Sequence, residues 1–146
     1  TLEGGRISIG ALAVGIAQGA FDYALKYAGE RKQFGKPLTG HQAVAFKFAD
    51  MQTEISAALH LVYHAARLKD AGRPFGNEAA MGKYYASEVC MRATYEAIQI
   101  LGGNGFSREY PVERMYRDAK LCTIGEGTSE VQKLIISRDL IRGAQA

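Results

Sequence analysis

The sequence predicts an all-α fold, an antiparallel (up-down) four-helix bundle with one short additional helix. Apolar residues recur at three- and four-residue spacing through most of the 146 residues, which is the period of an amphipathic helix. Alternating patterns typical of strands are nearly absent. Glycine, proline and short polar segments separate the periodic stretches, as expected where antiparallel helices are joined by short loops.

The first two helices are expected to be long. The first runs from about Arg6 to Glu30 and cannot continue through Gly35–Pro37. The second opens after a capping box formed by Thr39 and Gln42, and Gly72–Pro74 stops it. The inner face of the first helix is expected to contain Leu12, Ile16, Ala20 and Ala24. That of the second is expected to contain Val44, Phe48, Met51, Ile55, Ala58 and Val62.

Three further helices follow. Asn77 is expected to cap the third, which ends at Gly102–Gly105, where a Schellman-type cap is one interpretation of the glycines and a nucleotide-binding loop a weaker one. Its inner face contains small residues that permit close helix approach: Ala86, Cys90, Ala93, Ala97 and Leu101. A short helix is expected over 111–120 and a last one over 129–142.

Composition indicates one globular domain, with 47% hydrophobic and 23% charged residues. Acids are interleaved with the basic residues at a net charge of only +3, which argues against a nucleic-acid partner. No apolar run is expected to reach the roughly 20 residues that cross a bilayer. The opening residues include no initiator Met, so an internal piece of a longer protein is expected.

Histidines and cysteines do not predict a metal site. His60 and His64 would share one helix face, but no glutamate stands beside the first of them, as zinc-protease motifs require. Cys90 and Cys122 have no metal or redox spacing and suggest a reducing compartment.

The segment around Glu126 is the first candidate for chemistry. Gly125 and Gly127 flank this carboxylate, which lets the backbone approach a ligand closely, and Thr128 or Ser129 can cap the following helix. A catalytic base is one interpretation. A purely structural capping box formed by Ser129 and Gln132 is the other.

Basic and aromatic residues after the first helix are the second candidate. Arg31, Gln33 and Phe34 stand beside Gly35 and could hold a phosphate and a stacked ring, or could simply end a helix with Phe34 packed on the bundle. Arg6 falls in the first turn of its expected helix, where the macrodipole disfavours a cation. A nearby anion, such as a ligand or Glu126, would explain it.

Five separated motifs in register resemble the acyl-CoA dehydrogenase family over essentially the whole chain. They are Arg31–Leu38, His41–Gln42, Gln99–Phe106, Tyr116–Ala119 and Glu126–Thr128. The resemblance covers only the C-terminal helical domain of that family, without its N-terminal helical and middle β domains. It implies an FAD enzyme that introduces a double bond between Cα and Cβ of an acyl-CoA thioester.

The resemblance also implies roles for particular residues. Glu126 matches the base that removes the α proton, and Arg6 lines the acyl-CoA site beside it. Glu3 matches a CoA-contacting position and is a weaker candidate base, while Gly125 and Gly127 border the substrate. Cofactor contacts are implied for two groups of residues that meet across a subunit interface. One group is Arg31, Lys32, Gln33, Phe34, His41, Gln42, Gln99, Ile100, Leu101, Gly102 and Gly103, and the other is Thr128, Ser129 and Glu130.

A homodimer or homotetramer, electron-transferring flavoprotein as the electron acceptor, and a role in fatty acid β-oxidation follow as further implications. So does a location in the bacterial cytoplasm or, in a eukaryote, the mitochondrial matrix. Two alternatives stay open: an acyl-CoA oxidase or nitroalkane-oxidase-like flavoenzyme on the same fold, and a noncatalytic helical assembly domain.

The sequence departs from the family pattern in one respect. Many members have an aromatic residue where this chain has Gly125, a difference that opens the acyl pocket and suggests short or branched substrates. Some branched-chain members place the base on the first helix, beside the arginine that Arg6 matches. The residue there is Gly5, which cannot be a base, so Glu126 remains the candidate.

Overall fold

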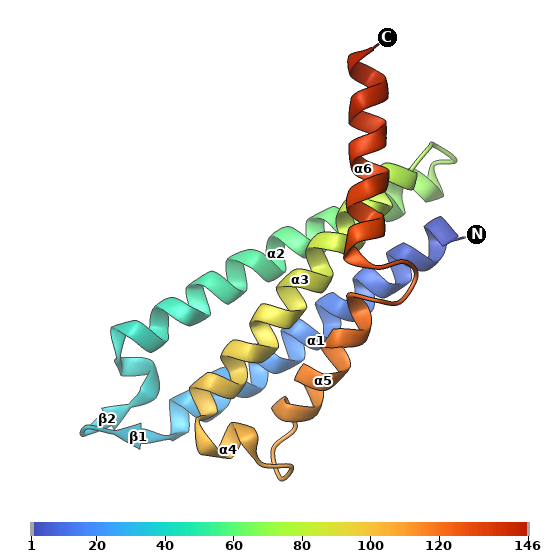
Figure 1. Cartoon of the computed structure of the whole chain (residues 1–146). Coiled ribbons are helices and arrows are strands. Elements are labelled where there is room, and N and C mark those ends of the chain that lie inside the picture. The colour runs from blue at the N-terminus through green and yellow to red at the C-terminus, as the bar shows by residue number, and fades with distance from the viewer. Residues whose placement is uncertain (1, 146) are drawn as a thin grey trace.

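The computed structural model describes residues 2–145. Five helices of three turns or more follow one another as α1 (Leu2–Glu30), α2 (Gln42–Asp70), α3 (Gly76–Leu101), α5 (Val112–Cys122) and α6 (Ser129–Ala144). Shorter elements connect them: the hairpin β1 (Lys32–Gln33) and β2 (Lys36–Pro37), the 3-10 turn η1 (Leu38–Gly40) and the one-turn helix α4 (Gly103–Phe106). The prediction of an all-α fold is confirmed (Figure 1).

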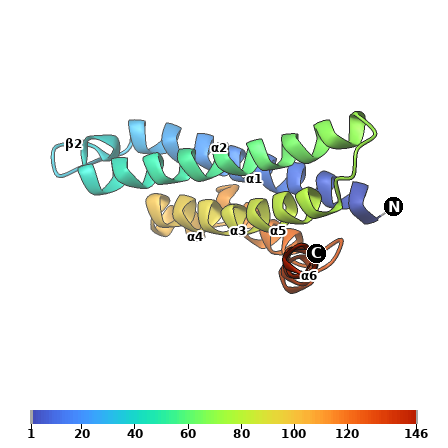
Figure 2. The same ribbon diagram turned by 90° about the horizontal axis from the view of Figure 1, so that it is seen from above.

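Helices α1 and α3 form the centre of the bundle. α2 packs against both of them, and α5 contacts both as well (Figures 1 and 2). Small side chains bring the helices close together; a methyl group on Gly82 of α3 would lie 3.4 Å from backbone atoms of Leu61 in α2. Larger buried side chains such as Ile55 and Val89 then fill the core, each contributing roughly 1.5 to 3 kcal/mol by leaving water.

The inner faces expected for the second and third helices are largely confirmed, whereas that of the first is partly wrong. α1 begins at Leu2, so Arg6 lies beyond the first turn and the argument from the helix dipole does not apply. Leu12 is 46% exposed, and the buried face instead contains alanines at helical spacing. These are Ala13, Ala17, Ala20, Ala24 and Ala28. Alanine has the highest helix propensity and lets α3 approach closely. Ala20 and Ala24 lie on this face as expected.

The last helix is the one that extends beyond the bundle. α6 packs on α3 near its N-terminal end and then projects past the other helices (Figure 1). Its outer half exposes large apolar side chains, with Leu140 66% and Ile141 57% accessible. The short helix α5 is the fourth packed helix, because Val112, Ala119 and Cys122 are fully buried.

Helix ends differ from three expectations. The Thr39–Gln42 capping box is wrong, since α2 starts at Gln42 directly after His41 and no side chain caps it. Asn77 does not cap α3, which begins one residue earlier. The short antiparallel ladder β1–β2 was not expected; it is a two-residue pairing on either side of Phe34 and Gly35. Gly102, at φ 60°, ends α3 as predicted.

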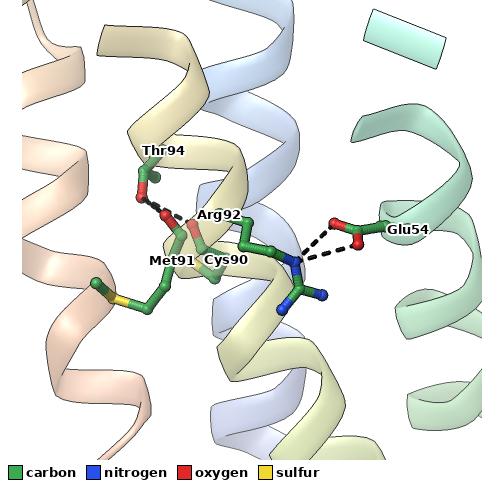
Figure 3. Close-up of polar contacts among 5 residues, drawn as sticks. All are labelled: Glu54, Cys90, Met91, Arg92 and Thr94. Atoms are coloured by element: carbon green, nitrogen blue, oxygen red, sulfur yellow. Dashed lines mark hydrogen bonds and ion pairs between the residues drawn. The ribbon is translucent and has the colours of Figure 1, made fainter. Parts of the chain in front are cut away.

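Polar contacts also join neighbouring helices. Figure 3 shows Arg92 of α3 donating from Nε to both carboxylate oxygens of Glu54 in α2, at 3.1 Å each. Exposed pairs of this kind contribute about 0.2 to 1 kcal/mol. In the same view the Thr94 hydroxyl lies 2.7 Å from the carbonyl of Cys90, which satisfies a buried polar group within its own helix. The Cys90 thiol, hydrogen-bonded to Cys122 and buried, has a pKa raised well above its ordinary value.

α1 meets the length and apolarity criteria for a membrane span, with a mean hydropathy of 1.3 over its most apolar window. The expectation that no apolar stretch reaches this length is wrong by that measure. Packing explains the composition, because 39% of that window is buried inside the bundle against α2, α3 and α5.

Candidate functional site

The loop between α5 and α6 holds Glu126 in an unusual backbone conformation. Glu126 has φ 55° and Gly127 has φ 92°, so two consecutive residues lie in the left-handed region. Glycine adopts this conformation freely, whereas a glutamate held in a sparsely populated region carries a cost of about 1 to 3 kcal/mol. The surrounding structure must therefore hold the loop in place.

Two buried side chains bind the carbonyl groups of this loop. Gln132 donates from Nε2 to the carbonyl oxygens of Glu126, at 3.1 Å, and Gly127, at 2.9 Å. Lys83 of α3 donates from Nζ to the same Gly127 oxygen at 2.8 Å. Both side chains are fully buried. Gln132 is thus a structural ligand of the loop, and the capping box proposed for Ser129 and Gln132 is wrong: Thr128 caps α6 by accepting a hydrogen bond from the Val131 N–H.

The Glu126 carboxylate lies against Gly5 of α1. A methyl group on Gly5 would come within 2.6 Å of Glu126 Cδ and Oε2, so only glycine leaves room for the carboxylate there. Arg6, the next residue of α1, is buried, with only 9% of its surface exposed. Its Nε has no hydrogen-bond partner within residues 2–145. The carboxylate itself belongs to a residue that this chain leaves exposed to solvent.

Gly125 and Glu3, the other two candidates near this site, differ in their surroundings. Gly125 has room for a side chain: a methyl group there would lie 3.5 Å from the Leu121 carbonyl oxygen and 3.8 Å from Ile9 Cδ1. Glu3 points elsewhere, because its Oε1 would meet a methyl group on Gly76 at 2.6 Å, at the first residue of α3. The Glu3 carboxylate therefore lies beside the start of α3.

The second group of predicted residues lines a cavity at the opposite end of α1. Its volume is about 420 Å³, and it brings together both motifs that the sequence singled out there. The lining residues are Tyr27, Arg31, Gln33, Leu38, Ile100, Leu101, Gly102, Gly103 and Asn104. Asn104 fixes one wall by donating from Nδ2 to the Tyr27 hydroxyl at 2.8 Å. The cavity presents a guanidinium and an amide beside two glycines that carry no side chains.

The hairpin beside this cavity exposes an aromatic ring. Phe34 is 93% exposed at φ 53°, so the alternative in which it packs on the bundle is wrong. Its ring meets that of His41 edge to face, with centroids 6.1 Å apart. His41 in turn lies 3.0 Å from the Gln33 carbonyl oxygen through Nε2. Lys32, Gln42 and Gln99 are exposed around the same end.

A family model described as the acyl-CoA dehydrogenase C-terminal domain matches residues 1–141. The chain belongs to the acyl-CoA dehydrogenase family. The "Probable acyl-CoA dehydrogenase YngJ" of Bacillus subtilis is 61% identical over 142 residues, which are 97% of this chain and 37% of that protein.

Two other relatives support the same family assignment. The caffeyl-CoA reductase-Etf complex subunit CarC of Acetobacterium woodii is 51% identical over 97% of this chain and 38% of its own length. The structure of butyryl-CoA dehydrogenase from Megasphaera elsdenii superposes with a TM-score of 0.95 at 51% identity, covering 96% of this chain and 37% of that one. The chain therefore spans little more than a third of the length of the relatives it matches.

In this acyl-CoA dehydrogenase domain the two candidate regions lie far apart. Gly5, beside Glu126, and Arg31, beside the cavity, are separated by the whole of α1. At a rise of 1.5 Å per residue this corresponds to roughly 40 Å. A third small group lies on the Glu126 side, around a cavity of about 120 Å³ lined in part by Thr128, Ser129 and Glu130. The Ser129 hydroxyl donates there to Glu88 Oε1 at 2.8 Å, while Glu130 is exposed.

Metal-ligating side chains do not gather anywhere in residues 2–145 of this acyl-CoA dehydrogenase domain. His60 and His64 are both exposed on α2. Within residues 2–145, no three His, Cys, Asp or Glu side chains are grouped closely enough to hold a metal ion.

Proposed function

We propose that this chain is the C-terminal helical domain of an FAD-dependent acyl-CoA dehydrogenase in which Glu126 is the base that removes the α proton of the substrate. One observation carries the proposal. The Glu126 carboxylate is seated on a glycine of α1, next to a buried arginine whose Nε has no protein partner within residues 2–145. A base on a strained loop and a buried arginine, with an Nε donor that is free within the described residues, together fit an acidic or carbonyl-bearing ligand.

The residues at the opposite end fit the phosphate portion of a dinucleotide. Arg31 and Gln33 supply donors of the kind that bind pyrophosphate, and Gly102 and Gly103 allow close approach, since a methyl group on either would meet nothing within 4 Å. The exposed ring of Phe34 is available for packing against a ligand. Arg31, Gln33, Gly102 and Gly103 would thus hold the diphosphate, with Lys32, His41, Gln42 and Gln99 around them.

The chain's own residues would perform the following steps. The Glu126 carboxylate accepts the proton on Cα, and its backbone N–H, which has no acceptor within residues 2–145, donates to the thioester carbonyl. That hydrogen bond stabilises the negative charge that develops on the carbonyl oxygen as the proton leaves. When bound, the flavin would accept the hydride from Cβ. Arg6 helps to hold the acyl-CoA beside the base.

Two copies of the chain are needed to complete one site. The roughly 40 Å between the Glu126 region and the Arg31 cavity places them too far apart for one ligand to bridge them along α1. We therefore infer that Arg31 and the Gln99–Gly103 segment of one copy serve the cofactor whose reacting ring lies near Glu126 of another. A homodimer or homotetramer provides that arrangement.

The Glu126 region of each copy would be covered by the parts of the longer protein that this chain does not include. Glu126 is exposed here, and a base works efficiently on a carbon acid only when water is excluded. Electron-transferring flavoprotein is the expected acceptor of the electrons. A role in β-oxidation follows from the same assignment.

A second direction of reaction is favoured by one relative. Because CarC is named as a subunit of a reductase-Etf complex and is 51% identical, reduction of an enoyl-CoA is the alternative activity. Glu126 would then be the acid that delivers a proton to Cα. The two activities are the forward and reverse directions of one reaction at the same site, and they differ in whether the acyl-CoA is oxidised or the enoyl-CoA is reduced.

Glu126→Gln in the full-length flavoenzyme tests the proposal. The variant should retain FAD but lose flavin reduction by acyl-CoA, by roughly 100- to 10,000-fold, because the amide cannot accept a proton. Anaerobic stopped-flow absorbance measures the reduction, and the spectrum before mixing measures bound FAD. Reduction at the wild-type rate would assign the base to another residue, with Glu3 next to be tested. Fast reoxidation of the reduced wild-type enzyme by oxygen would indicate an oxidase instead.

A further inference from the structure

One buried lysine is unexplained by packing. Lys83 lies in the N-terminal third of α3, is fully buried, and forms no ion pair within residues 2–145. A buried cation without a carboxylate partner is unfavourable, and an apolar side chain of similar size would serve the core better. Within residues 2–145, the one hydrogen bond that its Nζ donates goes to the Gly127 carbonyl, on the Glu126 loop.

The loop is attached to α3 at three points, all within two turns of that helix. The Ser87 hydroxyl lies 2.7 Å from the carbonyl of Cys122, at the end of α5. Glu88 accepts the hydrogen bond of Ser129, where α6 begins. Lys83 holds the centre of the loop, at the residue directly after Glu126. The first two contacts fix where the loop starts and ends, and only the third acts on the peptide groups around Glu126.

Two donors share the Gly127 carbonyl oxygen. Lys83 Nζ at 2.8 Å and Gln132 Nε2 at 2.9 Å can occupy its two lone pairs, and Gln132 also binds the Glu126 carbonyl. With both carbonyl groups bound to buried side chains, rotation of these peptides is opposed. The left-handed conformation of Glu126, which is unfavourable for a residue with a side chain, is held in this way.

We propose that Lys83 is a positioning residue for the catalytic step. Together with Gln132, it fixes the peptide groups of Glu126 and Gly127, so that the Glu126 carboxylate stays in place against Gly5. Lys83 acts through the Gly127 carbonyl and does not touch the substrate. This inference rests on the proposed role of Glu126 as the base.

The test uses Lys83→Met and Lys83→Arg in the full-length flavoenzyme. Methionine has nearly the same length and no donor, whereas arginine retains one. Displacement of a catalytic group by about 1 Å costs roughly 100-fold in rate. We expect Lys83→Met to slow flavin reduction by acyl-CoA by roughly 10- to 100-fold with KM changed less than about threefold, and Lys83→Arg to recover part of the loss. An α-deuterated substrate should show a larger isotope effect with Lys83→Met than with the wild type, because proton removal becomes more limiting.

Thr94→Val is the matched control. Thr94 is a fully buried polar residue on the same helix, its hydroxyl bonds only within α3, and it contacts no part of the loop. The melting temperatures of Lys83→Met and Thr94→Val are measured together with their rates, so that a change in stability is separated from a change in the reduction step. A slow reduction step confined to Lys83→Met supports positioning, and equal rates in the two variants would overturn it.

A double-mutant cycle provides a second measurement. Because Lys83 and Gln132 bind one carbonyl, the effects of Lys83→Met and Gln132→Leu on the reduction rate should be non-additive. Additive effects would contradict the proposal. Absence of flavin reduction in the wild-type enzyme itself would instead refute the proposed function, so the two failures are distinguishable.

Discussion

The Glu126 carboxylate occupies the space beside Gly5 in which any other residue at that position would place its Cβ. That Cβ would lie 2.6 Å from both Cδ and Oε2 of Glu126 and 2.9 Å from Oε1. The position of the proposed base is thus determined jointly by a strained loop and by a side chain that is missing from a helix 121 positions earlier in the sequence.

Gly5→Ala should displace the carboxylate without unfolding the protein. Alanine favours a helix by about 1 kcal/mol over glycine, so stability should be kept or raised, while the clash moves the base. We expect flavin reduction by acyl-CoA to fall by roughly 10- to 100-fold, measured by stopped-flow absorbance. Gly15→Ala, where a methyl group on the same helix meets nothing within 4 Å, is the control and should leave the rate unchanged. An unaffected rate in Gly5→Ala would mean that the carboxylate reacts from another position.

Arg31→Ala should weaken FAD binding more than it weakens the fold. A charge-assisted hydrogen bond to pyrophosphate contributes about 1.5 to 3 kcal/mol, which corresponds to roughly 10- to 150-fold in the dissociation constant. Titration of the apoenzyme with FAD measures the effect. Arg92→Ala removes a cation from the bundle surface outside the cavity and is the control. A variant that binds FAD normally yet melts at a much lower temperature would show that Arg31 is structural.

Gly125→Tyr tests whether the open space beside Ile9 accepts the acyl chain. The backbone there tolerates a Cβ, so the new ring should extend toward the reacting carbons and disfavour branched acyl-CoAs relative to straight ones of equal carbon number. Overpacking commonly costs about 1 to 3 kcal/mol. The measurement is kcat/KM for each pair of substrates, with Gly125→Ala as the variant that adds only a methyl group. Equal losses for both classes would exclude Gly125 from the acyl pocket.

The stability of the protein should depend on pH through Lys83. Burial lowers the pKa of Lys83 from 10.5, and Arg6 adds to this effect, whereas Cys122, Glu88 and Glu130 oppose it. Between the lowered pKa and 10.5 the unfolded chain binds more protons than the folded one, so the free energy of unfolding rises with pH in that window. Urea denaturation at several pH values should show the free energy of unfolding of the wild type increasing relative to that of Lys83→Met as the pH rises toward 10.5. With Thr94→Val the difference should be constant, and a constant difference for Lys83→Met as well would contradict the assignment.

Apolar residues at helical spacing made the buried faces of α2 and α3 predictable from the sequence. Phe48, Met51 and Ile55 repeat at helical spacing and are buried as expected. α1 was predicted less well, because Leu12 was expected on the buried face and is exposed, whereas Ala20 and Ala24 are buried as expected. Its start was expected at about Arg6, whereas the helix begins at Leu2 and includes Gly4 and Gly5.

The sequence identified the candidate residues that lie in recognisable motifs, but it did not identify the residues that hold them in place. Glu126 and Arg31 stand in recognisable surroundings, whereas Lys83 looks like any helical lysine. One signal was present: Lys83 lies three and seven residues before Ala86 and Cys90, on the buried face of its own helix. A lysine in that register must either reach water or find a buried acceptor, and only the fold reveals that the acceptor is the Gly127 carbonyl. The cellular compartment stays a prediction.

The length of α1 has a genetic consequence. If each cofactor is held by the Arg31 end of one chain and used by Glu126 of another, then a chain defective only at Glu126 and a chain defective only at Arg31 each retain the half that the other lacks. Co-assembled in one oligomer, they would form one site with both defects and one with neither. Two alleles that are inactive alone would partly complement each other, and an organism carrying both would be less impaired than one carrying two copies of either.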